Sequence, residues 1–101
     1  MSIAYGLMEQ MKYNDKGQLI NGNFLDYKLP TAVDSPDFDA AFVETNDPTG
    51  PYGNKSLGEP PAITPAPAIR NAVANATGVR VASLPLDPEK LAMAFKDAGI
   101  A

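Results

Sequence analysis

The chain has 101 residues, a formal net charge of −4, and neither cysteine nor histidine. A chain of this length forms at most one small domain. The missing residue types exclude disulfides, Cys/His zinc sites, cysteine-ligated iron–sulfur clusters, and catalytic triads or dyads built on histidine within the chain. The basic residues are scattered along the sequence and do not form the basic patch that is typical of a nucleic-acid-binding protein. No apolar run reaches the ~18 residues of a membrane span, so we expect a cytoplasmic protein without membrane contact.

Ten prolines and eight glycines are many for this length, yet 45% of the residues are hydrophobic, which argues against disorder. The combination predicts short elements joined by stiff loops around a small core. We therefore expect the chain to depend on a partner or on self-association.

The first third of the chain predicts a helix, a turn and a strand. Residues 1–12 place apolar side chains at helical spacing: Ile3, Leu7, Met8 and Met11. Residues 13–20 contain a turn signal, with Gly17 suited to a left-handed conformation. Residues 24–29 predict a strand that stops at Pro30.

The middle of the chain predicts a loop, a strand and a turn. Residues 31–36 indicate a loop. Residues 38–44 predict a strand with Phe38, Ala40 and Phe42 on one face. Residues 46–49 then predict a turn.

The last third predicts helix, strand and helix. Thr64 and the prolines that follow it predict the start of a helix over residues 65–77, which Gly78 ends. Residues 79–84 predict a short strand. Asp87 is the expected N-cap of a last helix that Gly99 ends. The predicted fold is therefore α+β, with about three helices and three to five short strands in a single partial domain over residues 1–101.

The motif GPYGNKSLGEPP at residues 50–61 is the candidate for chemistry. Glycine leaves backbone amides unshielded, so such a loop can present them to an anion or a cofactor. Lys55 could add a positive charge, and Glu59 could accept a proton. On composition alone, a structural turn with a solvated glutamate remains the alternative, as does a small-molecule or anion-binding loop.

This motif resembles the GPxGxKGxGEPP loop of the xanthine dehydrogenase/aldehyde oxidase family of molybdenum hydroxylases. Further stretches resemble the same family in the same order: AYGLME at residues 4–9, NGNFLDYKLP at 21–30, the segment 68–80, and LPLDPEK at 84–90. The resemblance covers nearly the whole chain. It implies the C-terminal part of the molybdenum-cofactor-binding domain in the molybdopterin-binding large subunit.

In that family, the glutamate of the GEPP element acts as general base beside the molybdenum during hydroxylation of a heteroaromatic ring or an aldehyde. The resemblance makes Glu59 the candidate base. It places Lys55, Ser56, Leu57 and Gly58 against the pterin cofactor. The pterin dithiolene holds the metal, so the resemblance implies no metal ligand from the protein.

The resemblance also implies what lies outside the chain. The complete enzyme carries a molybdenum–pterin cofactor, with iron–sulfur clusters and FAD on other domains or subunits. We expect the chain to bind no cofactor and to be inactive alone, becoming an oxidoreductase component when the rest of the large subunit completes it. The alternative is a truncated or excised non-catalytic fragment that folds and self-associates. The expected partner is thus the remainder of the molybdenum-binding subunit or a further copy of the chain.

Overall fold

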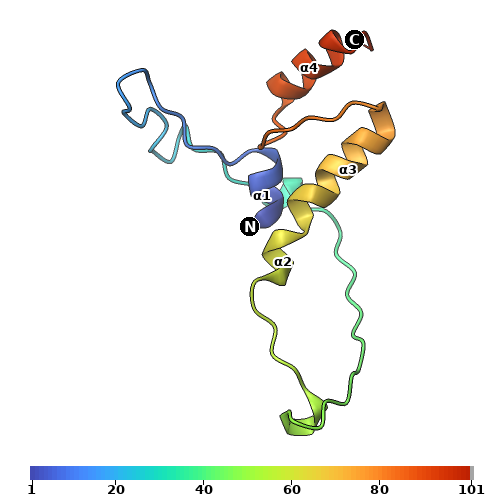
Figure 1. The fold of residues 1–101 in the computed structure, drawn as a ribbon. Coiled ribbons are helices and arrows are strands. Elements are labelled where there is room, and N and C mark those ends of the chain that lie inside the picture. The colour runs from blue at the N-terminus through green and yellow to red at the C-terminus, as the bar shows by residue number, and fades with distance from the viewer. Residues whose placement is uncertain (101) are drawn as a thin grey trace.

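Three helices pack together and form the part of the molecule that we call the helical body. In the computed structural model, which describes residues 1–100, these are α1 (Ser2–Leu7), α2 (Pro60–Ile63) and α3 (Pro65–Thr77) (Figure 1). Short 3₁₀ turns, η1 (Ala32–Asp34) and η2 (Pro51–Gly53), interrupt the long connection between α1 and α2. A further helix, α4 (Pro88–Asp97), follows the body.

The predictions for α3 and α4 are confirmed. Helix α3 ends at Gly78, which has φ +76° and donates its N–H to the carbonyl oxygen of Ala74 at 2.8 Å. Helix α4 begins after Asp87, whose carboxylate accepts a hydrogen bond from the backbone N–H of Lys90 at 2.9 Å. The start of α3 differs from the prediction, because Thr64 has helical φ and ψ and makes no side-chain cap. The unpredicted turn α2 leads directly into it.

Helix α1 is shorter than predicted and ends at Leu7 instead of Lys12. The amides of Met8 and Glu9 both donate to the carbonyl of Ala4, which closes the last turn. Beyond it, the buried side chain of Asn21 donates to the Gln10 carbonyl at 2.7 Å and accepts from the Lys12 amide at 2.8 Å. The backbone after α1 is therefore paired with a side chain, not with a further helical turn.

The predicted α+β fold is wrong: residues 1–100 contain no sheet, and their strand content is an isolated bridge between Tyr13 and Leu19. The turn inside this bridge is as predicted, with Gly17 at φ +75°. In place of the strand predicted at 24–29, residues 24–26 form a turn, because the Asn23 side chain accepts hydrogen bonds from the amides of Leu25 and Asp26, at 2.9 Å each.

The other two predicted strands also lack a ladder. At residues 79–84, the backbone is held by a helix side chain, since Arg70 Nε donates to the Val81 carbonyl at 2.6 Å. Residues 38–44 have no strand opposite them within the described chain. Both segments carry strand-forming side chains, but a strand needs a partner that residues 1–100 do not supply.

The helical body has a small core. The buried apolar residues of the described chain are few: Ala4, Ala74, Val81 and Leu86. Among the described residues, no large side chain is fully enclosed. The radius of gyration is 18.3 Å, whereas a compact domain of this length has one of about 13 Å. Within residues 1–100, no helix is both long and apolar enough to cross a bilayer. Much of the chain therefore lies outside any core of its own.

Candidate functional site

Most of the candidate motif, residues 50–58, lies on a long loop, residues 35–58, which leaves the body after η1 and returns to α2 (Figure 1). The rest of the motif, residues 59–61, lies at the start of α2. Hydrogen bonds within the tip close it: the Asp47 amide donates to the Gly53 carbonyl at 3.1 Å, and the Gly50 amide to the Asp47 carbonyl at 3.3 Å. Glycine is required at position 50, because a Cβ there would overlap the carbonyl oxygen of Asn54. Gly53 has φ +75°. Two glycines of the motif thus shape the tip.

Lys55 lies beside this tip and faces the loop itself. Its Nζ is 3.8 Å from Oδ2 of Asp47, and the lysine side chain is 60% exposed. Thr49 holds Asp47 in place, donating from its amide at 2.8 Å and from Oγ1 at 2.6 Å. These hydrogen bonds, that of the hydroxyl first, keep the pKa of Asp47 below its usual value. An ion pair this exposed contributes little to stability, so the lysine can be drawn to another anion.

Glu59 lies at the other end of the motif, where the loop joins the body. It is the residue before α2, and its side chain is exposed. Two residues later, the Pro61 carbonyl accepts a hydrogen bond of 3.4 Å from Oγ of the buried Ser2. The carboxylate is therefore carried by a backbone that is anchored to α1, while its own oxygens face solvent.

Between these two charges, Ser56, Leu57 and Gly58 are exposed, and their amides have no hydrogen-bond partner within the described chain. Gly58 is the glycine of the motif that the chain's own geometry does not require: a Cβ there would have no atom within 4 Å, and its φ is not left-handed. Free amides beside a glycine with open space fit one wall of a cofactor site. Across residues 1–100, no three His, Cys, Asp or Glu side chains gather where they could hold a metal ion.

The structure brings some of the predicted site residues together and separates others. Lys55 and Ser56 line an open hollow of about 540 Å³ at the loop tip, together with Asp47. Glu59 does not line this hollow. Asp47, the ion-pair partner of Lys55, was not among the predicted site residues. The signal for it was Asp47-Pro48-Thr49, where a threonine two residues after an aspartate can hydrogen-bond its carboxylate.

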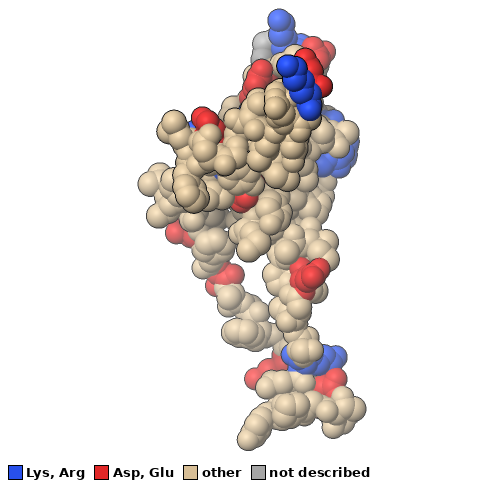
Figure 2. Space-filling model, turned by 90° about the vertical axis from the view of Figure 1, so that its left-hand side faces the viewer, with Lys and Arg blue, Asp and Glu red and all other residues tan. Residues whose placement is uncertain are grey.

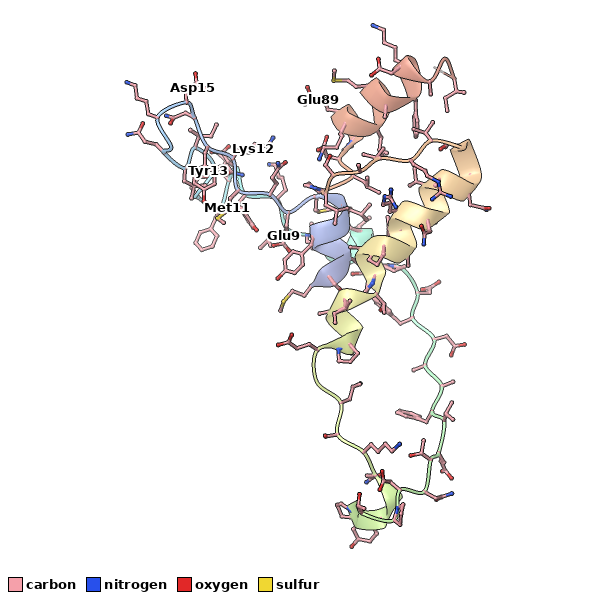
Figure 3. The ribbon with its side chains drawn as sticks, viewed as in Figure 1. Glu9, Met11, Lys12, Tyr13, Asp15 and Glu89 are labelled. Atoms are coloured by element: carbon pink, nitrogen blue, oxygen red, sulfur yellow. The ribbon has the colours of Figure 1, made fainter. Side chains whose placement is uncertain are left out.

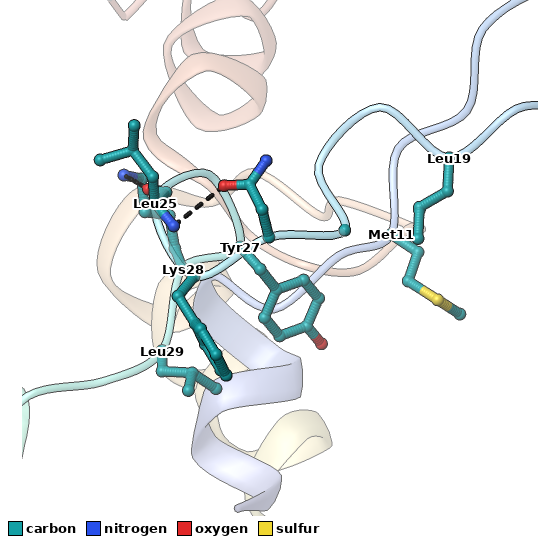
Figure 4. A pocket seen from close by; sticks show the side chains of 9 residues that line it. Met11, Leu19, Leu25, Tyr27, Lys28 and Leu29 are labelled. Carbon is teal, nitrogen blue, oxygen red and sulfur yellow. Dashed lines mark hydrogen bonds between the residues drawn. The ribbon is translucent and has the colours of Figure 1, made fainter.

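A second hollow, of about 710 Å³, lies in the segment that follows α1, residues 11–29, which we call the arm, and has mostly apolar walls (Figure 4). Met11, Leu19 and Leu25 contribute to it. The charged group in its lining, Lys28, donates from Nζ to the Leu25 carbonyl at 2.9 Å. The labelled side chains of this arm, among them Lys12, Tyr13 and Asp15, lie apart from the long loop (Figure 3). This hollow has no carboxylate to accept a proton, so the long loop remains the candidate site.

Comparisons with known proteins place the chain in one family. Residues 1–36 match the model of the molybdopterin cofactor-binding domain. The chain is 50% identical over 101 residues to the xanthine dehydrogenase molybdenum-binding subunit of Escherichia coli O157:H7. This match covers 99% of this chain and 13% of that protein. It is 38% identical over 97 residues to the nicotine 6-hydroxylase large subunit of Paenarthrobacter nicotinovorans, covering 93% of this chain and 12% of that protein.

Solved structures agree with the sequence relatives. Quinoline 2-oxidoreductase from Pseudomonas putida 86 superposes with a TM-score of 0.81 at 31% identity, over 95% of this chain and 13% of that one. The Cu,Mo-CO dehydrogenase superposes with the same TM-score at 27% identity, over 98% of this chain and 13% of that one. The chain thus spans about one eighth of the length of the proteins that it matches.

Proposed function

Because the chain belongs to the molybdenum hydroxylases, as a segment of their molybdopterin-binding large subunit, we propose that it contributes the general-base glutamate, Glu59, to the cofactor site. The complete protein would be a hydroxylase of heteroaromatic or aldehyde substrates. Relatives named for xanthine, nicotine and aldehyde oxidation support this substrate class.

The observation that carries the proposal is the position of Glu59. Its carboxylate is exposed, and it stands on a backbone tied to the body through Pro61 and Ser2. A general base needs a fixed position within hydrogen-bond reach of the proton it takes. The carboxylate at residue 59 meets the first requirement through this anchor, and the rest of the subunit would provide the substrate that it faces.

The residues before Glu59 would hold the cofactor. In this proposal, the amides of Ser56, Leu57 and Gly58 donate hydrogen bonds to polar atoms of the pterin. Lys55 gives up its exposed ion pair with Asp47 and binds an anionic group of the cofactor instead. Gly58 lets the pterin approach the backbone, because nothing from the chain lies where a Cβ would be. The cofactor, when bound, supplies the redox chemistry of the hydroxylation. Glu59 takes up a proton on a carboxylate oxygen.

The test is a chimera in which this chain replaces its matching segment in the E. coli xanthine dehydrogenase molybdenum-binding subunit. We expect the chimera, assembled with the other components of that enzyme, to oxidise xanthine. Glu59→Gln keeps the size of the side chain but removes its basicity, so we expect kcat to fall by about 10²–10⁴-fold. Steady-state kinetics measures the effect.

Glu89→Gln is the matched control, because Glu89 is also an exposed glutamate at the start of a helix and lies on α4 (Figure 3). It should leave kcat within about twofold of the parent. Molybdenum and pterin contents are measured in every variant, which separates loss of the base from loss of the cofactor. A Glu59→Gln chimera with full cofactor and unchanged kcat would exclude Glu59 as the base.

A further inference from the structure

Residues 35–46, the outgoing half of the long loop, have an unpaired backbone. They run out from η1 in an extended path (Figure 1), which begins at Ser35, with φ −79° and ψ 126°, and ends where Asn46 takes φ +48°. Every one of these residues is exposed, and within the described chain none makes a hydrogen bond through its backbone or its side chain. A row of unpaired N–H and C=O groups in an extended segment is a template for an added strand.

The side chains of this segment are those of a covered strand. In an extended backbone, Phe38 and Phe42 lie on one face and Val43 lies on the other. The exposed fractions are 78% for Phe38, 94% for Phe42 and 88% for Val43. Two large aromatic side chains on one face are typical of a strand with that face covered, whereas the face of Val43 also carries Asp37 and Asp39. Full burial of a phenylalanine contributes about 1.5–3 kcal/mol, which the isolated chain does not gain here.

The superpositions point to the occupant. Two enzymes superpose on this chain over 95–98% of its length with a TM-score of 0.81. The match makes up 13% of each of those chains. Most of the polypeptide of these enzymes therefore lies outside the match, where it can cover a segment that has no partner within residues 1–100. This favours the remainder of a molybdenum-binding subunit as the neighbour.

The charge of the segment argues against a second copy. Between Leu29 and Asn54 the sequence contains no lysine or arginine, but it contains five carboxylates: Asp34, Asp37, Asp39, Glu44 and Asp47. Red carboxylates are correspondingly scattered down this part of the surface, with a blue group near its tip (Figure 2). Pairing the segment with itself would bring like charges together across the strands, which is destabilising.

We propose that residues 36–45 bind the remainder of a molybdenum-binding subunit by strand addition, and that the strand they pair with is neutral or basic. Backbone hydrogen bonds provide the affinity, and pockets for Phe38 and Phe42 fix the register. This inference rests on membership of the family and not on the role of Glu59. The added strand would hold the outgoing half of the loop, and so set where the tip and residues 50–61 lie.

Hydrogen exchange tests the proposal. The probe is the E. coli xanthine dehydrogenase molybdenum-binding subunit expressed without its matching segment. In the chain alone, we expect amides of residues 37–45 to exchange at the rate of an unfolded peptide. On mixing, alternate amides in this segment should slow by at least tenfold. The chimera described above provides the same readout without depending on binding between separate chains.

Two outcomes would overturn the proposal. Exchange at residues 37–45 that stays fast in a chimera with bound cofactor would show that the segment pairs with nothing. Protection that appears in the chain alone and grows with its concentration would assign the segment to a second copy. Glu59→Gln should leave the protection unchanged, so failure of the proposed base and failure of the strand are distinguishable.

Adjacent alanines provide a matched pair of variants. Successive N–H groups of a strand point to opposite sides, so Ala40 and Ala41 donate in opposite directions. Proline at either position removes a donor yet fits an extended backbone.

If a neighbouring strand lies on one side only, one of the two variants, Ala40→Pro or Ala41→Pro, should weaken binding to the probe by at least tenfold. If strands lie on both sides, both variants should weaken it by this amount. Ala40→Ser and Ala41→Ser, which keep the N–H, should bind like the parent. Parent-like binding by both proline variants would contradict strand addition.

Discussion

The helical body and the long loop are built in opposite ways. In the body, α1 packs on α3 with Gly6 and Ala4 buried, and the Leu86 amide donates to the Gly6 carbonyl at 2.7 Å. The loop leaves this body with most of its side chains exposed, and its internal hydrogen bonds lie at the tip. The body therefore holds its shape through its own contacts, whereas the outgoing half of the loop makes no hydrogen bond within residues 1–100.

The glycines show the same difference at single positions. A Cβ on Gly6 would lie 3.1 Å from Cδ1 of Ile69 and 3.4 Å from Cα of Ala66, so α1 and α3 approach closely because this residue is a glycine. A Cβ on Gly58 would meet nothing within 4 Å. Glycine in the body is explained by a neighbour in the chain. At position 58, the proposed explanation is the cofactor.

The largest effect on the isolated chain is expected from Gly6→Val. Its methyl groups would press on Ala66, and the backbone there cannot move aside as the tip of Ile69 can. Overpacking of this kind costs about 1–3 kcal/mol, which exceeds the few tenths that valine gains over glycine in helix propensity. We expect the free energy of unfolding to fall by about 2 kcal/mol, as measured by urea denaturation followed by circular dichroism at 222 nm.

Gly58→Val is the matched variant in the loop and sharpens the comparison. In the isolated chain it should change the free energy of unfolding by less than about 0.5 kcal/mol, as exposed substitutions usually do. In the chimera it should lower the pterin content. Equal destabilisation of the isolated chain by both variants would show that the loop has internal contacts like those of the body.

A smaller effect is expected at α4, which packs on no other helix of the described chain. Asp87→Ala removes the hydrogen bond of 2.9 Å to the Lys90 amide. Losing such a cap costs about 1 kcal/mol of helix stability. We expect helical chemical shifts of residues 88–97 to weaken in NMR spectra, while those of α3 stay unchanged. A parallel loss in α3 would contradict this and show that α4 is part of the body.

What could be predicted from the sequence follows the same division. Helices α3 and α4 were predictable because Gly78 and Asp87 act within one turn of the chain. The strands at 24–29 and 79–84 were not, because side chains such as Asn23 and Arg70 hold backbone groups there that a strand would pair. At 38–44 the strand pattern is present, but residues 1–100 lack the neighbour that would make it a strand.

The candidate site divides similarly. The order of glycine, lysine and glutamate in residues 50–61 was readable, since it is a local motif. The pairing of Lys55 with Asp47 was not, because it joins residues on opposite sides of the tip. Nor does the motif reveal that the backbone two residues beyond Glu59 is anchored by Ser2, at the other end of the chain. Contacts over long sequence separation are what a linear pattern leaves out.

The smallest expected effect distinguishes two similar turns within the connection between α1 and α2. Thr49 donates from its hydroxyl and its amide to Asp47 at the tip, and Thr31 does the same to Asp34 near the body. Both sets of hydrogen bonds hold the pKa of the aspartate below 3.8. A lowered pKa in the folded state means that the stabilisation is fully present above the unfolded value, 3.8, and is lost as pH falls through the folded value.

Thr49→Ala removes the hydroxyl donor and should raise the pKa of Asp47 toward 3.8, as measured by following its carboxyl carbon by NMR between pH 2 and 6. Thr31→Ala should raise the pKa of Asp34 by less, because the Thr31 backbone N–H, the larger cause there, remains. It should leave the pKa of Asp47 unchanged, so each variant is the control for the other. In the chimera, the tip would also meet the rest of the subunit. A pKa of Asp47 that stays low in Thr49→Ala would contradict the assignment of the hydroxyl as the main cause, and would leave the Thr49 amide, at 2.8 Å, as the donor that stabilises the carboxylate.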